Sequence, residues 1–155
     1  LPIHGTAIYS TDSYTFRSGL GATAVMNWEV TGRNSESVSN IQKRIRDFKK
    51  LRPYYYGDFY PLTKAVNNTR DDVWLAYQLN RPDHKDGIIL AFRRSYNSEE
   101  GIHIKLSGLE PDSLYEVTFE DYAIVINKSG SELMEDFEIT IPQKPSSLMI
   151  SYKAL

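Results

Sequence analysis

Hydrophobic and polar positions alternate over short runs in the second half of the chain. The runs are residues 73–79, 88–94, 102–106, 114–119, 122–127, 137–141 and 148–153. Alternation with a period of two predicts β-strands. The segments between them, such as RPDHKDG, SGLEPDS and PQKPSS, are rich in turn-forming residues. The pattern therefore predicts an antiparallel β-sandwich or barrel.

The alternation also assigns side chains to faces of these strands. In the first run it places Val73, Leu75, Tyr77 and Leu79 on one side. In the run 88–94 it places every second residue from Ile88 together.

The first half of the chain has a different pattern. Residues 1–8, LPIHGTAI, predict a short strand, and residues 22–30, ATAVMNWEV, are almost continuously apolar. A strand of the second kind is usually buried on both faces, as in a parallel sheet. Such a strand needs neighbouring strands and covering helices that this chain does not supply.

Two helices are predicted in this half. A short one runs through Tyr14 and Arg17, with Thr11 or Asp12 as its cap, and ends at the glycines 19 and 21. A longer one follows the apolar stripe Val38, Ile41, Ile45, Phe48 and Leu51. Its start is either a capping box at Ser39 and Gln42 or a turn earlier, at Ser35. Pro53 ends it.

These elements predict a mainly β protein with two parts. The first part holds a strand and a helix that fit the last leg of a larger α/β sheet or barrel. The second part is an antiparallel sandwich or barrel. The rest of the α/β sheet or barrel would precede Leu1, so we expect the chain to be part of a longer protein.

Composition narrows the function classes. The chain has 155 residues, a formal net charge of −2 and no cysteine, which excludes disulfides and cysteine-ligated zinc. The three histidines share no metal-ligand spacing, so no metal and no cofactor is expected. No apolar run is long enough to predict a membrane span or membrane partner. The basic residues of the long helix fit a solvated face, so no nucleic acid is expected. The cellular compartment is left open.

The order of several motifs resembles a known enzyme family. The motifs are LPIHGT, DSYTFRSGLG, a strand ending in NW, LRPYYYGDFYPLT, DDVWLAYQLNRP, GIILAFRRS, IKLSGLEPDSLYEV, SGSELM and ISYK. Together they resemble the C-terminal part of the α-galactosidase-like (melibiase) glycoside hydrolases of family 36 and its clan. The resemblance covers essentially the whole chain. It implies that residues 1–63 are the terminal portion of a (β/α)8 barrel, including its last strand and helix. It also implies that residues 64–155 are a C-terminal antiparallel β-sandwich.

The resemblance also implies a chemistry that this chain does not carry alone. The family hydrolyses α-linked galactosides with retention, using a nucleophilic aspartate near a Lys-x-Asp motif and an acid/base aspartate in a Ser-Asp context. Neither motif is present, so no catalytic residue is assigned. The neighbouring carboxylates Asp71 and Asp72, like Glu99 and Glu100, point to opposite faces of a strand and form no catalytic pair. We expect the fragment to be structural and non-catalytic.

Residues 54–63, YYYGDFYPLT, are dense in aromatic rings, and Gly57 and Pro61 argue against a regular helix or strand there. The rings either pack two structural layers together or stack against sugar rings. Packing is favoured, because aromatic residues dominate cores and domain junctions.

Three residues are candidates for substrate binding in the intact enzyme. Active-site residues of a barrel follow the C-terminal ends of its strands. His4 is expected at the end of the first short strand, and Trp28 near the end of the second. Arg17, in the short helix or a loop, is a third candidate for a substrate hydroxyl or carboxylate. Core packing and structural ion pairing are the alternatives for these residues.

Two other functions are left open. One is a stand-alone carbohydrate-binding β-sandwich, with Tyr55 or Tyr60 in its sugar platform. The other is a non-enzymatic protein-interaction module, with self-association through the exposed barrel edge before Gly32.

Overall fold

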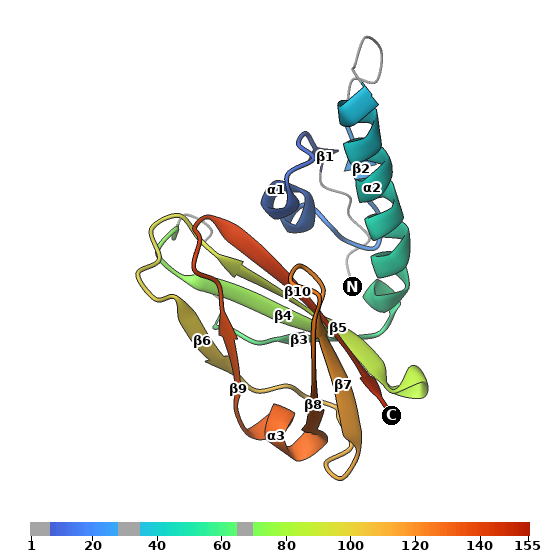
Figure 1. Ribbon diagram of the computed structural model, residues 1–155, viewed down its shortest axis with the longest axis vertical. Coiled ribbons are helices and arrows are strands. Elements are labelled where there is room, and N and C mark those ends of the chain that lie inside the picture. Colours follow the sequence, from blue (N-terminus) through green and yellow to red (C-terminus); the bar gives the residue numbers. More distant parts are fainter. Residues whose placement is uncertain (1–6, 28–34, 65–69) are drawn as a thin grey trace. The chain divides into compact units, whose positions relative to one another are not determined.

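The computed structural model describes residues 7–27, 35–64 and 70–155, and it divides the chain into two compact units (Figure 1). The first unit is Leu1–Tyr56 and the second is Gly57–Leu155. Most of the regular structure is antiparallel sheet, which confirms the predicted mainly β class.

The first unit holds a parallel pair of strands and two helices. In chain order these are β1 (Ala7–Ile8), α1 (Ser13–Ser18), β2 (Val25–Met26), α2 (Ser35–Leu51) and the 3₁₀ helix η1 (Arg52–Tyr56). Strand β1 pairs in parallel with β2, with Ala7 opposite Val25. The parallel pairing agrees with the apolar sequence of this segment.

Strand β2 is nevertheless shorter and more exposed than the sequence predicts. It spans two residues within the segment 22–30, and Val25 is 54% exposed. Among the described residues β2 pairs only with β1. The expectation that it is buried on both faces is therefore wrong for this chain, because the second neighbour and the covering layers are not supplied by the described residues.

The helix ends follow capping chemistry. The side chain of Asp12 accepts a hydrogen bond from the Thr15 amide at 2.8 Å, so Asp12 is the N-cap of α1, and Gly19 is its C-cap. Helix α2 begins at Ser35, so the earlier of the two predicted starts is correct and the capping box at Ser39 is wrong. It ends at Leu51, and η1 contains Pro53.

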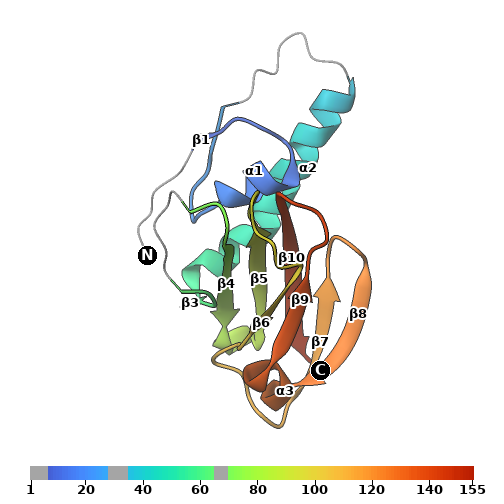
Figure 2. The same cartoon turned by 90° about the vertical axis from the view of Figure 1, so that its left-hand side faces the viewer.

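The second unit is a β-sandwich. Its elements are β3 (Asp58–Pro61), β4 (Trp74–Arg81), the 3₁₀ helix η2 (Pro82–His84), β5 (Asp86–Arg93), β6 (Gly101–Ile104), β7 (Leu114–Phe119), β8 (Ile124–Ser129), α3 (Gly130–Glu135), β9 (Phe137–Thr140) and β10 (Ser146–Ala154). Six strands form one sheet in the order β3-β4-β5-β10-β7-β8, and β6 pairs with β9 in a second sheet (Figure 2). All seven strands predicted in this half are confirmed.

The main core lies between the two sheets. It contains Trp74, Ala76, Ile89, Ala91, Ile104, Leu106, Leu109, Tyr115, Val117, Leu133, Phe137, Ile139, Ile141, Leu148, Ile150 and Tyr152. On β4, Trp74 and Ala76 belong to this core. Leu75 and Tyr77, which alternate with them and form the apolar face predicted from the sequence, therefore lie on the other face of the sheet. There Tyr77 stacks on Phe92 of β5 at a centroid distance of 6.4 Å, and Phe59 of β3 lies 5.5 Å from Tyr77.

Two elements differ from the sequence-based expectation. Residues 58–61 form the edge strand β3, paired antiparallel with β4, so Gly57 and Pro61 bound a strand instead of preventing one. This segment, assigned to the barrel portion by sequence, hydrogen-bonds into the antiparallel sheet. Residues 127–132, NKSGSE, are expected as a turn, but α3 begins within them at Gly130, and Ser129 and Glu132 form its capping box.

Candidate functional site

The C-terminal edge of the β1–β2 pair is the candidate site in the first unit. Both strands run in the same direction, so Tyr9 and Ser10, which follow β1, and Asn27, which follows β2, leave the pair at the same edge. The Asn27 amide donates a hydrogen bond to the Ile8 carbonyl at 3.1 Å and holds this edge together. Tyr9 is 68% exposed. In a barrel, such positions carry the substrate-binding and catalytic groups.

The three candidate residues have different places relative to this edge. Strand β1 ends at Ile8, so His4 precedes the strand and does not follow it. Trp28 comes one residue after Asn27 in the chain. His4 and Trp28 themselves lie outside the described residues. Arg17 is in the last turn of α1 and is buried, with 5% of its surface exposed. Because Arg17 is buried, a substrate would contact it only in a pocket that extends to the last turn of α1.

Sequence reasoning missed Tyr9, Ser10 and Asn27. Their signal is their position just after a strand. From the sequence, the first strand is expected to end at His4, whereas β1 ends at Ile8.

Arg44 of α2 fixes the loop that follows this edge. Its guanidinium donates to the Thr11 carbonyl and to the Ser13 hydroxyl, each at 2.8 Å. It also pairs with Asp47 at 2.9 Å and lies 5.5 Å from the centre of the Phe16 ring. One side chain thus ties the start of α1 to α2 and sets the course of residues 9–12.

Asp12 remains ionised in this loop. Partial burial works to raise the pKa of its carboxyl, but hydrogen bonds with the Ser10 side chain and from the Thr15 amide outweigh it, so the pKa is lowered. An ionised Asp12 suits the N-terminus of α1, where the helix dipole favours negative charge.

The adjacent carboxylates of the second unit are engaged in ion pairs. Asp72 accepts from Arg70 at 2.6 and 2.7 Å. Asp71 pairs with Arg94. A retaining glycosidase needs two free carboxyl groups about 5 Å apart, one of them able to act as an acid. Asp71 and Asp72 each face a cation instead, so this pair does not form such a site.

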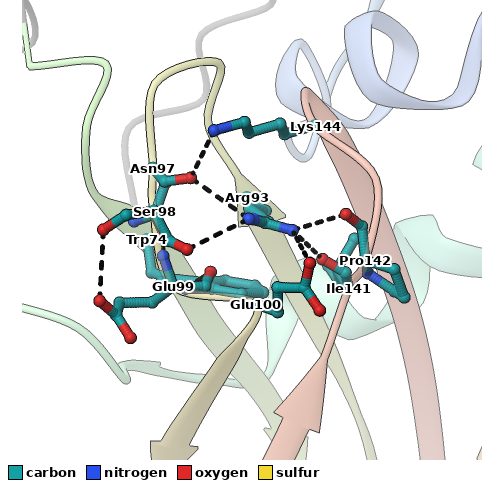
Figure 3. A network of polar contacts seen from close by, with 9 residues as sticks. All are labelled: Trp74, Arg93, Asn97, Ser98, Glu99, Glu100, Ile141, Pro142 and Lys144. Atoms are coloured by element: carbon teal, nitrogen blue, oxygen red, sulfur yellow. Dashed lines mark hydrogen bonds and ion pairs between the residues drawn. The ribbon is translucent and has the colours of Figure 1, made fainter.

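A buried arginine organises one end of the sandwich (Figure 3). Arg93, at the end of β5, is 3% exposed. Its Nη1 donates to the carbonyls of Ile141 and Pro142 at 2.8 and 2.6 Å, and its Nη2 donates to the carbonyl of Asn97 at 3.3 Å. The loop after β5 and the segment after β9 are thereby joined through one guanidinium.

The surroundings of Arg93 mark it as structural. A carboxylate oxygen of Glu100 lies 3.9 Å from Nη1 of Arg93, and the Glu100 side chain is largely exposed. Carbonyl oxygens, and not a carboxylate, are therefore the main acceptors of the guanidinium. Lys144 donates to the same Asn97 carbonyl at 3.0 Å, and the Trp74 indole donates to the Glu99 carbonyl at 3.1 Å. With both terminal nitrogens bonded inside the fold, Arg93 is not a ligand-binding cation.

A second buried polar network lies between the sheets. The Gln78 side chain donates to the Tyr152 hydroxyl at 2.7 Å and to the Ser107 carbonyl at 2.8 Å, and it accepts from the Ser107 amide at 2.9 Å. The Tyr152 hydroxyl donates to Asn80 at 2.8 Å. Burial raises the pKa of Tyr152, so the phenol keeps its proton. This network is fully paired and needs no ligand.

The aromatic residues of 54–60 divide between the two units and differ in exposure. Tyr55 is 7% exposed, so its ring is not a sugar platform, whereas Tyr56 is 65% and Phe59 47% exposed. On β3, one face of the Phe59 ring packs against Tyr77, and the Tyr60 hydroxyl lies near Asp58.

Elsewhere, a surface hollow of about 380 Å³ is lined by Tyr122, Thr140, Ile141, Pro142, Gln143 and Ser146.

Within the parts of the chain that the structure describes, no group of three or more acidic, histidine or cysteine residues is arranged to hold a metal ion. Among the same residues, no helix has the length and apolar character of a membrane span.

Comparison with known proteins agrees with the resemblance seen in the sequence. No protein-family model and no curated protein sequence matches the chain. Solved structures do match, each over 97% of this chain and 22% of its own length. They include the α-galactosidase from Lactobacillus brevis (TM-score 0.72, 14% identity) and the GH36 α-galactosidase AgaB from Geobacillus stearothermophilus (0.67, 18%). A third is a variant of the GH36 α-galactosidase AgaA from the same organism, in complex with raffinose (0.69, 15%).

The chain thus spans about a fifth of the length of the proteins that it matches, and the sequence identities support a common fold and not a common substrate. Both units take part in the match, because it extends over nearly the whole chain. The described protein therefore has the fold of the C-terminal part of the GH36 α-galactosidases.

Proposed function

We propose that this chain is the C-terminal portion of an α-galactosidase-like glycoside hydrolase. In the intact enzyme, residues 1–56 complete a (β/α)8 barrel, and the sandwich that follows supports it. The intact enzyme cleaves α-linked galactosides with retention, through two aspartates on barrel strands that precede Leu1. The role of this portion is structural, with one wall of the pocket contributed by its first unit.

One observation carries this proposal: the parallel β1–β2 pair is separate from the antiparallel sheets that follow. Two strands of two residues each, with Val25 exposed, do not make an independent core. Parallel strands are normally covered on both faces and flanked by further strands. The remaining strands of a barrel would provide both.

The pocket wall follows from the same geometry. Residues after β1 and β2 open toward the side on which barrel enzymes bind substrate. Trp28 then offers an apolar face to a sugar ring and Arg17 a donor to hydroxyl groups, whereas His4, which precedes β1 in the chain, stays a candidate from the sequence alone. Tyr9 and Asn27 join them, since both are exposed at the strand ends. An α-galactoside such as raffinose, the ligand of one matched structure, is the substrate class that we propose.

The proposal predicts that the 155-residue chain alone does not hydrolyse an aryl α-galactoside. Turnover by the chain that is lost when one of its own aspartates or glutamates is replaced by the amide would overturn it. The coding sequence before Leu1 gives a second test. A strand ending in Lys-x-Asp, followed by one ending in Ser-Asp, supports the proposal, and an upstream region with neither motif contradicts it.

A second candidate function is carbohydrate binding without catalysis. Phe59 of the sandwich favours it, because an exposed aromatic ring is suited to stacking on a sugar ring. Titration calorimetry of the chain with raffinose decides this candidate. Heat of binding that falls on Phe59→Ala supports it, and the absence of binding heat removes it.

A further inference from the structure

The loop between β1 and α1, residues 9–12, leaves the first strand at the candidate edge. Short-range hydrogen bonds shape it locally. The Asp12 amide donates to the Ser10 hydroxyl at 3.2 Å, and the Asp12 carboxylate accepts from the Thr15 amide at 2.8 Å. These bonds join the loop to α1, and its position relative to α2 is set by a different contact.

Arg44 of α2 supplies this contact over a long separation in the chain. Its Nε donates to the Thr11 carbonyl and its Nη2 to the Ser13 hydroxyl, each at 2.8 Å, across 33 and 31 residues. The Thr11 acceptor is a main-chain oxygen, so the bond holds the backbone of the loop itself. Because the guanidinium is planar and rigid, two donors of one group fix the direction of the loop as well as its distance from α2.

Arg44 is in turn held in place by its neighbours. Its Nη1 lies 2.9 Å from a carboxylate oxygen of Asp47, and 13% of the Arg44 side chain is exposed. The guanidinium carbon lies 5.5 Å from the centre of the ring of Phe16, which is buried. Each of the three guanidinium nitrogens therefore has a partner inside the first unit. This arrangement suits a residue that positions others and does not itself contact a ligand.

We propose that Arg44 is a positioning residue of the α-galactoside pocket: it holds residues 9–12 so that the Tyr9 side chain meets the sugar in one fixed place. This role rests on the proposed function, because a completed barrel puts the loop that follows β1 on the substrate side. Binding groups must be held to within about 0.5 Å of their productive geometry, and loops hold them less precisely than strands and helices do. The two hydrogen bonds from α2 compensate for this in residues 9–12.

The loop should contribute to substrate binding and not to the chemical step. Tyr9 lies outside the two-aspartate chemistry proposed above, so it contacts the bound substrate and the transition state alike. Loss of such a uniform contact raises KM and leaves kcat unchanged. A side chain needed only for folding would instead lower the amount of active enzyme, and with it the apparent kcat.

The test uses the full-length protein, including the sequence that precedes Leu1, with raffinose as the substrate. Arg44→Lys keeps a positive charge beside Asp47, but a single ammonium group cannot reproduce the fork that holds Thr11 and Ser13. We expect KM to rise about tenfold and kcat to stay within about twofold of the parent. The matched control is Arg46→Lys, an exposed arginine of the same helix, which should leave both constants unchanged.

Ser13→Ala keeps the test decisive should Arg44→Lys not fold. It removes one acceptor of the guanidinium and no more than a hydroxyl group. We expect KM to rise about threefold, in line with the loss of one hydrogen bond. The two changes combined should raise KM by less than the product of their separate effects, because both break the same contact.

Amide hydrogen exchange of residues 9–12 in the same proteins follows the loop directly. It should be faster in Arg44→Lys and unchanged in Arg46→Lys. A parental KM in both Arg44→Lys and Ser13→Ala, a loss confined to kcat, or a raised KM without faster exchange in the loop overturns the role of Arg44 and leaves the proposed function standing. A full-length parent that hydrolyses neither raffinose nor an aryl α-galactoside overturns the proposed function, and the role of Arg44 falls with it.

Discussion

Tyr152 of β10 lies directly opposite Gly87 of β5, and its phenol occupies the space that a side chain at residue 87 would fill. A methyl group added at Gly87 would overlap the Tyr152 hydroxyl and also approach the Leu79 carbonyl. The glycine therefore makes room for the tyrosine whose hydroxyl joins Gln78 and Asn80.

Replacing this glycine should be costly. We expect Gly87→Ala to lower the free energy of unfolding by about 3 kcal/mol, because neither the buried ring nor the strand backbone can move away easily. Gly101→Ala, also in a strand, is the matched control. Its nearest neighbour would be the flexible carboxylate of Glu138 at 3.3 Å, and we expect a change within about 0.5 kcal/mol. Urea denaturation measures both variants, and equal effects would show that the overlap does not matter.

The Tyr152 hydroxyl should contribute to stability separately from the ring. In Tyr152→Phe the ring remains, but the Gln78 amide and the Asn80 carbonyl oxygen each lose a buried partner. We expect a loss of about 2 kcal/mol, typical of leaving buried polar groups unpaired. Tyr122→Phe removes an exposed hydroxyl and should change little. A Tyr152→Phe protein as stable as its parent would indicate that the network adds nothing to the fold.

Arg93 should be the most important cation of the sandwich. Arg93→Met keeps an apolar chain of similar length but leaves the carbonyls of Ile141 and Pro142 without their donor. We expect a loss of about 3 kcal/mol. Arg70→Met breaks an exposed ion pair with Asp72 that solvent screens, so it should change the melting temperature much less than Arg93→Met. Thermal denaturation of the two variants compares them, and the opposite ranking would contradict the structural role of Arg93.

The capping box of α3 predicts a dependence on pH. Hydrogen bonds from the Ser129 amide and hydroxyl lower the pKa of Glu132 in the folded state. Its ionised form therefore stabilises the fold at pH values above the unfolded pKa of about 4.3, and this contribution is lost as the pH falls through the lowered folded value. We expect Glu132→Gln to be less stable than the parent near about pH 6, and the difference to shrink as the pH falls below the unfolded pKa.

Exposed Glu135 on the same helix supplies the comparison for this measurement. Glu135→Gln removes a carboxylate from this helix but leaves the Ser129–Glu132 capping box intact, so it is the matched control. If the difference between the parent and Glu132→Gln stayed constant with pH, ionised Glu132 would not be the source of the stabilisation.

Local patterns were sufficient to predict much of this fold. Period-two alternation located seven strands, and capping residues located the start of α1 and the end of α2. Helix α3 was missed, although the spacing of Ser129 and Glu132 is a capping signal, because the glycine between them resembled a turn. Strand β3 is not predicted from the sequence, because Gly57 and Pro61 argue against regular structure, whereas an edge strand accepts proline at its end.

Other features depend on partners that sequence spacing does not identify. Alternation separates the two faces of β4 but does not say which one meets the second sheet, and both faces of β5 are buried. The roles of Arg93 and Gly87 depend on segments about fifty or more residues away in the chain. The candidate edge at Tyr9 and Asn27 required the strand ends to be located within a residue or two. The residues Arg17, His4 and Trp28 stay predictions for the pocket.

Strand β10 lies between β5 and β7, although both of those strands precede it in the chain by more than twenty residues. In this sheet it is the only link between the three strands on one side and the β7–β8 hairpin on the other. During synthesis, the edges of β5 and β7 that face β10 therefore have no hydrogen-bond partner until residues 146–154 have been made. Chaperone protection during that interval would matter more for this domain than for one whose central strand is made first.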